Sequence, residues 1–130
     1  MNKIQATIIS IESQNNISLV RLETASNIFS ALILNLHKKA SIGAECNVLF
    51  KENEVMVAHK NYTLISARNR FVSKVKQIET DNIFARITFE FSGTEITSLI
   101  TKEASKALNI KVGEEFVWFV KSNEVALEFK

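Results

Sequence analysis

The chain has 130 residues, of which 46% are hydrophobic and 23% charged, and its formal net charge is +2. This balance is typical of a folded globular protein with one ordinary domain or two very small ones. The small net charge gives no bulk electrostatic reason to expect a nucleic acid or an acidic membrane as partner. No apolar run is long enough to cross a bilayer, and the first residues do not resemble a secretory signal, so we expect no membrane association and a cytoplasmic location.

The first half of the chain predicts five strands. Short runs of β-branched and aromatic residues alternate with polar turn residues, which is the usual pattern of strands joined by turns. These runs cover residues 4–11, 17–23, 28–34, 45–50 and 54–60. The link 51–53 between the last two runs is short enough for a tight hairpin. The single cysteine, Cys46, cannot form an internal disulfide and is expected to be a buried thiol.

The second half predicts the same five strands and one additional helix. Its runs cover residues 71–78, 84–91, 95–100, 115–120 and 124–129, with a second short link at 121–123. Between the third and fourth runs, Ala104 and Leu108 stand at helical spacing. Thr101 is suited to cap this helix, and Glu103 in its first turn suits the helix dipole. A short helix is therefore expected in the second half alone.

The two halves are copies of one module. The segment from Asn2 aligns with that from Asn69, and the offset stays constant as far as Ile33 and Ile100. Near the end of each half the offset is three residues larger, and both copies then carry the pattern K-x-N-E-V. Agreement of this length predicts an internal duplication. The two copies are assigned to residues 1–64 and 65–130.

Five strands with one short helix near the fourth are the outline of a small five-stranded barrel of the OB type. The expected fold is therefore all-β, with two tandem five-stranded OB-like barrels and a short helix in the second repeat. One copy of about 60 residues has a marginal core, and the run 115–120 is apolar on both faces. We therefore expect the halves to pack closely and the chain to form a homodimer. The alternative is one larger ten-stranded sandwich.

Residue patterns that support catalysis are absent from the sequence. His37 and His59 are isolated, without the spacing of metal ligands. The paired glutamates stand in expected turns, where a solvated charge is commoner than an acid–base pair. Cys46 has no base near it in sequence, and three glycines are too few for a glycine-rich phosphate loop. We expect no enzymatic activity, no covalent cofactor and no side chains that bind a metal ion directly.

A candidate binding segment lies at the junction between the copies. Ser66 and Arg68 are two residues apart, so on an extended segment both side chains project to the same side. A hydroxyl and a guanidinium placed this way can share hydrogen bonds to one oxyanion. The alternative is a solvated linker with one surface arginine.

Further polar groups of the second copy fit the same ligand. Thr101 precedes the short helix, whose first N–H groups are free to face an anion. Lys121 and Ser122 provide an ammonium and a hydroxyl in the link before the last strand. The first copy has Glu52 where the second has Ser122, lacks the helical insertion, and has no Ser-Ala-Arg before its own asparagine. The ligand groups are thus concentrated in the second copy, and the first is depleted of them.

The order of these motifs resembles a known family. S-A-R-N at the junction, an I-T-x-E segment, L-x-I-x-x-G and a final K-S-x-E-V are similar to the molybdate-binding module of the TOBE/Mop family. That module occurs in molbindins, in the effector domain of the molybdate-responsive transcription regulator and at the end of molybdate transporter ATPases. The resemblance covers residues 66–129 well and residues 2–60 as a weaker, shortened copy.

The resemblance implies an oxyanion site at a subunit interface. Its side-chain ligands would be Ser66, Arg68, Thr101, Lys121 and Ser122, and its backbone donors would lie near Ala67 and Ala104. The family often has serine where this chain has Ala104, which puts one hydroxyl ligand in doubt.

The function expected from residues and resemblance together is the binding of molybdate or tungstate for intracellular storage, homeostasis or sensing, in a homodimer or higher homo-oligomer. One alternative is a single-stranded nucleic-acid-binding protein of the OB type, although the aromatic residues fall within apolar strands and are expected in the core. Another is a structural or dimerisation module that has lost its ligand.

Overall fold

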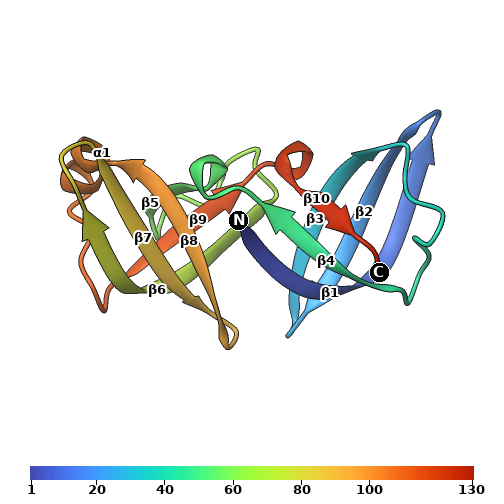
Figure 1. Ribbon diagram of the computed structural model, residues 1–130, viewed down its shortest axis with the longest axis horizontal. Helices are drawn as coiled ribbons and strands as arrows, with labels where there is room; N and C mark the ends of the chain where they lie inside the picture. Colours follow the sequence, from blue (N-terminus) through green and yellow to red (C-terminus); the bar gives the residue numbers. More distant parts are fainter.

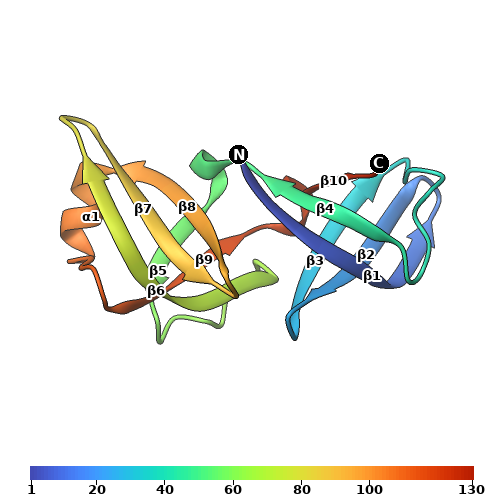
Figure 2. The same cartoon turned by 60° about the horizontal axis from the view of Figure 1, so that its bottom comes forward.

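The computed structural model describes residues 1–130 and consists almost entirely of strands. Two curved five-stranded sheets lie side by side along the longest axis of the molecule, each forming an OB-like barrel (Figure 1). The second view shows the same side-by-side arrangement (Figure 2), so the halves do not form the alternative ten-stranded sandwich. The expected all-β fold of two tandem barrels is confirmed.

The elements of the first copy follow the predicted runs closely. They are β1 (Asn2–Gln14), β2 (Ile17–Thr24), β3 (Asn27–Leu34), β4 (Glu45–Phe50), the 3₁₀-helix η1 (Glu52–Glu54) and β5 (Met56–His59). Along β1 the register against β2 shifts between Ile8 and Ser10. Such a β-bulge bends a strand and lets one sheet curl into a barrel.

The second copy repeats this order and adds the predicted helix. Its elements are β6 (Asn69–Thr80), β7 (Phe84–Phe91), β8 (Thr94–Thr101), α1 (Lys102–Ala107), β9 (Glu115–Val120), η2 (Ser122–Glu124) and β10 (Ala126–Glu128). The bulge recurs in β6, between Val75 and Gln77. Thr101 caps α1 as predicted, since its Oγ1 accepts a hydrogen bond from the N–H of Ala104 at 3.0 Å.

The fifth strand of each copy belongs to the barrel of the other copy. The sheet orders are β10-β4-β1-β2-β3 and β5-β9-β6-β7-β8. The two tight hairpins expected at residues 51–53 and 121–123 are therefore wrong. Lys51, Val55, Lys121 and Val125, which flank η1 and η2, all have extended backbone angles with negative φ. They do not reverse the chain as the positive φ values of a two-residue hairpin would, so each turn carries it across to the neighbouring barrel.

The two barrels share one hydrophobic core. The ring of Phe29 in β3 lies 4.8 Å from that of Phe71, and Phe50 in β4 stacks on Trp118 at 5.8 Å. The indole Nε1 of Trp118 donates to Ser73 Oγ at 2.9 Å, so this buried polar group is satisfied. The close packing expected between the halves is confirmed.

Most of the aromatic residues expected in the core are buried there. Phe89, Phe91, Phe116 and Trp118 have 5% exposure or less, whereas Phe84 is 46% exposed. The expectation that Phe84 belongs to the core is wrong, because it is the first residue of β7 and lies at the exposed end of that strand. Cys46 is buried as expected. None of the helices has the length and hydropathy that a membrane-spanning helix requires.

Two asparagines fasten the barrels together with the same geometry. Asn69 at the start of β6 accepts from the backbone N–H of Ser30 at 2.6 Å and donates to its carbonyl at 2.8 Å. Asn2 at the start of β1 does the same with Thr97, at 2.9 Å in both directions. Both asparagines are buried, so each amide replaces a strand neighbour for one residue of β3 or β8. They give the molecule a pseudo-two-fold relation.

Candidate functional site

The junction segment has the extended alternation predicted from sequence. Ser66 and Arg68 are exposed, whereas Ala67 between them is only 5% exposed. Asn69, the next residue, is fixed by its two hydrogen bonds to Ser30. The arginine side chain therefore starts from a backbone that is held at the boundary between the barrels.

Arg68 and Ser122 line the same cavity. The cavity has a volume of about 560 Å³ and is lined by Leu19, Arg21, Ile28, Ser30, Leu32, Arg68 and Ser122. We refer to it as the Arg68 cavity. Strand exchange creates it, because the chain crosses through η2 on its way to β10 and thereby brings Ser122 over β3. There Ser122 Oγ donates to Ser30 Oγ at 3.1 Å.

The electrostatics of the Arg68 cavity favour an anion. No acidic side chain forms an ion pair with Arg68, and no carboxylate belongs to the cavity lining. Arg21, the second cation of the lining, pairs with Glu12 at 2.8 Å. An unpaired guanidinium beside two hydroxyls can donate several hydrogen bonds to one oxyanion.

Ser30 and Arg21 were not found by sequence reasoning. Both lie within strands of the first copy whose sequence pattern indicates only a structural role, and nothing in the sequence places them near the junction. Their position beside Ser122 follows from the crossing of η2 to the first barrel. Three of the predicted residues are not part of the lining: Ala67 and Lys121 each adjoin a lining residue in the sequence, and Ser66 is two residues from Arg68.

Thr101 and Ala104 lie elsewhere in the chain. Thr101 borders a separate cavity of about 620 Å³, lined by Asn82, Ile83, Thr101, Lys102, Glu103 and Lys106. In Figure 1 α1 stands at the outer end of the second barrel, far from the turn between β9 and β10. A single chain therefore does not bring Thr101 and Ala104 together with Arg68. The N–H of Ala104 is also already used, since it donates to Thr101 Oγ1.

A larger cavity suits an anion less well. It measures about 670 Å³ and lies between the end of β5 and the start of β9. Glu114 and Glu115 belong to its lining together with Lys60 and Lys74, so its charge is mixed. No group of three or more histidine, cysteine or acidic residues is placed to hold a metal ion.

Two β-barrels of one repeated sequence, joined by exchanged strands, define a tandem β-barrel module. The profile of the TOBE domain matches residues 65–127. Molybdenum-pterin-binding proteins 1 and 2 of Clostridium pasteurianum are each 34% identical to this chain over 64 residues, which is 48% of this chain and 94% of each relative. The chain belongs to the TOBE/Mop family.

The whole architecture also has a solved counterpart. The cytoplasmic molybdate-binding protein ModG, in a crystal form with molybdate bound, superposes with a TM-score of 0.92. The match covers 99% of this chain and 96% of that one, at 26% sequence identity. The tandem arrangement of two barrels is therefore shared over the full length.

Proposed function

We propose that this protein binds molybdate or tungstate reversibly in the cytoplasm, for storage, homeostasis or sensing, and that it is not an enzyme. The observation that carries the proposal is the Arg68 cavity, whose lining contains a guanidinium without an ion-pair partner and two serine hydroxyls, and no carboxylate. The similarity to ModG and to the molybdenum-pterin-binding proteins supports the choice of oxyanion.

The groups around the cavity suit a tetrahedral dianion. Arg68 supplies a planar set of donors and a full positive charge, whereas Ser30, whose oxygen accepts from Ser122, keeps its own hydroxyl proton as a neutral donor. Arg21 also belongs to the cavity wall, where Glu12 balances its charge. The absence of a carboxylate matters because it would repel the ligand and compete for the same donors.

The complete site requires a second chain in this proposal. Thr101, Ala104 and the Arg68 cavity lie too far apart in the fold to hold one ion, so the neighbouring chain of a homodimer or higher homo-oligomer would supply the Thr101 end. Apolar side chains beside the cavity support such a contact. Ile28 and Leu32 in its lining are 40% and 43% exposed, and Leu34 further along β3 is 66% exposed. Covering them would gain hydrophobic free energy.

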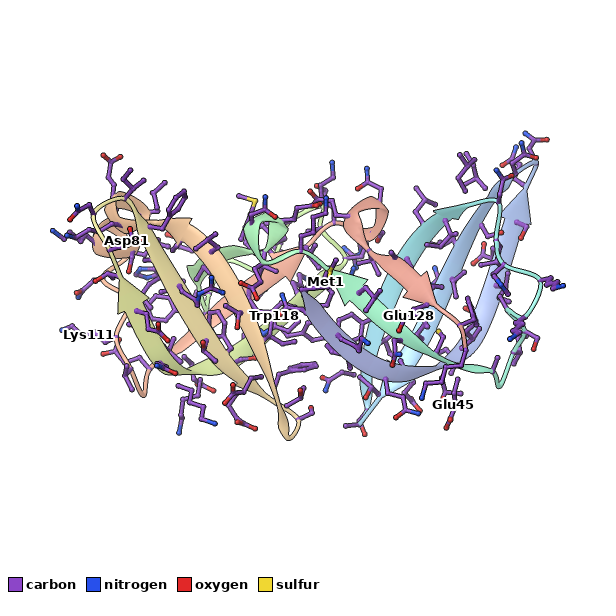
Figure 3. The ribbon with its side chains drawn as sticks, in the orientation of Figure 1. Met1, Glu45, Asp81, Lys111, Trp118 and Glu128 are labelled. Carbon is purple, nitrogen blue, oxygen red and sulfur yellow. The ribbon has the colours of Figure 1, made fainter.

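The test is calorimetric titration of the full chain with molybdate, tungstate and sulfate. Arg68→Ala removes a charge-assisted hydrogen bond worth about 1.5–3 kcal/mol, so we expect affinity to fall about ten- to a hundredfold. Lys111→Ala is the matched control, because it also removes one positive charge from the second copy but lies at the outer end of that barrel (Figure 3). We expect it to bind like the wild type.

Two results would overturn the proposal. One is equal oxyanion affinity in the wild type and the Arg68→Ala variant. The other is the absence of binding to any of the three anions, which would favour a module that serves assembly alone. Sedimentation of the wild type with and without molybdate tests the shared site, since a ligand held between chains must favour the oligomer.

A further inference from the structure

The pseudo-two-fold relation gives the Arg68 cavity a counterpart at the other end of the junction. The asparagine pairs match Ser30 with Thr97, and the turns η1 and η2 match Glu52 with Ser122. The counterpart therefore lies between β7, β8 and η1. The asparagine holds the backbone of this counterpart position by the same pair of hydrogen bonds. The two positions therefore differ in their side chains.

Glu52 forms an ion pair at this counterpart position. One of its oxygens accepts from Nη1 of Arg86, and the other lies 3.4 Å from the amino nitrogen of Met1. The side chain of Glu52 is only 25% exposed, although the residue lies in a surface turn. Its carboxylate thus points inward over the barrel, as Ser122 points over β3 in the other copy.

The cation at this position does not correspond to Arg68, which precedes β6, but comes from within a strand. Arg86 occupies in β7 the place of Leu19 in β2, and it pairs across the sheet with Leu99 as Leu19 pairs with Leu32. Leu19 and Leu32 both line the Arg68 cavity. The guanidinium of Arg86 therefore extends from the wall that corresponds to the wall of the first site.

We propose that the Glu52 carboxylate serves as an internal anion which fills a second, latent oxyanion site formed by Arg86 and β8. The inference rests on the proposed function for the chemistry of the Arg68 cavity. A carboxylate and an oxyanion make the same charge-assisted hydrogen bonds to a guanidinium. Glu52 has the advantage of being tethered, so it occupies the position without the entropic cost of binding from solution. Each chain then offers one open site of this kind.

The neighbouring charges agree with this assignment. Glu95, which stands in β8 where the first site has Ile28, forms an ion pair with Lys76 and is neutralised by it. Two further carboxylates lie close to Arg86 and have other partners: Glu79, opposite Arg86 across the sheet, accepts from Gln77, and Asp81 accepts from the N–H groups of Ile83 and Phe84. Removal of Glu52 would therefore take away the ion-pair partner of Arg86, which lies on the same face of the sheet as Thr97.

The experiment is the variant Glu52→Ser, which gives the first copy the residue that the second copy has at Ser122. Calorimetry with molybdate should give one additional bound anion per chain compared with the wild type. Glu128→Ser is the matched control, because it removes a carboxylate that pairs with Lys3 at 3.4 Å on the exposed strand β10. That control should keep the stoichiometry of the wild type.

Thermal unfolding provides a second readout that tolerates some loss of stability. Molybdate should raise the melting temperature of the Glu52→Ser or Glu52→Gln variant by more than it raises that of the wild type, because the anion replaces the lost carboxylate. Unchanged stoichiometry together with an unchanged melting shift would overturn the internal-anion assignment. If the wild type binds nothing but Glu52→Ser gains a site, the proposed function fails and this inference stands.

Discussion

The Arg68 cavity and its counterpart beside Glu52 have the same backbone frame and different side chains. In each place a 3₁₀ turn crosses to the other barrel and an asparagine fastens the strand beneath it. One place leaves a guanidinium without a partner, and the other closes an ion pair between Glu52 and Arg86. The comparison shows that the duplicated fold supplies two corresponding positions, and that their side chains differ at the turn and on the neighbouring strand: Glu52 with Arg86 at one, Ser122 with Leu19 at the other.

Removing the asparagine contacts that the two positions have in common should have the largest effect, which is on the stability of the fold. Asn69→Ala leaves the backbone N–H and carbonyl of Ser30 without partners in a buried place, and each unsatisfied group costs about 1–3 kcal/mol. Asn2→Ala removes the matching contacts of Thr97. We expect similar losses in the free energy of urea unfolding for both variants, and almost none for the exposed Asn61→Ala. A loss confined to one asparagine would show that the two positions are not equivalent.

Placing a carboxylate in the Arg68 cavity, as Glu52 does at the counterpart position, should have the next largest effect, and this effect is on molybdate binding. Ser122→Glu places a carboxylate where Arg68 can pair with it, so an external oxyanion must displace a tethered competitor. We expect molybdate affinity to fall by about tenfold to a hundredfold, which corresponds to roughly 1.4–2.7 kcal/mol. Ser122→Ala removes only a neutral donor and should weaken binding less. Equal losses in these two titrations would contradict the role given to charge.

The smallest effect on stability concerns the glutamates that end the two 3₁₀ turns, Glu54 in η1 and Glu124 in η2. A side-chain hydrogen bond with Glu124 raises the pKa of Glu54, and burial and repulsion between the carboxylates add to the rise. The folded state therefore binds this proton more tightly than the unfolded state, so the stabilising contribution is complete at low pH and is lost as pH rises through the raised pKa.

Glu54→Gln keeps a hydrogen bond without the second charge. We expect this variant to unfold at slightly higher urea concentration than the wild type at pH 7, with the difference disappearing near pH 4. Glu23→Gln, an exposed change on β2, is the control. A difference that persists or grows at acid pH would contradict the assignment.

Strand positions, the duplication and the helix in the second copy could be predicted from sequence because they follow from local patterns. Thr101 as a helix cap depends on three neighbouring residues and was predicted correctly. The exchange of fifth strands could not be predicted in this way. A three-residue link permits either a hairpin or a crossing, and the choice is made by the burial of Val55 and Val125 in a core built from both copies.

The same reasoning explains which part of the site could be predicted. Arg68 and Ser122 carry chemical signals of their own, and they do line one cavity. Ser30 lies in the middle of an apolar strand, so its role follows only from the crossing of η2. Glu52 was recognised as a replacement for serine, but its partner Arg86 is distant in sequence and becomes visible only in the fold. The assignment of Ser66, Thr101 and Lys121 as ligands stays a prediction.

The exchange of fifth strands also bears on how the protein is made. β10 comes from the last residues of the chain, yet it completes the sheet that begins with Asn2. The first barrel therefore lacks its edge strand until residues 126–128 have been synthesised, and it can close only after these residues have left the ribosome. Until then the exposed edge of β4 can pair with other chains, as unpaired edges generally do. Truncation of the final residues should thus harm the barrel that was synthesised first.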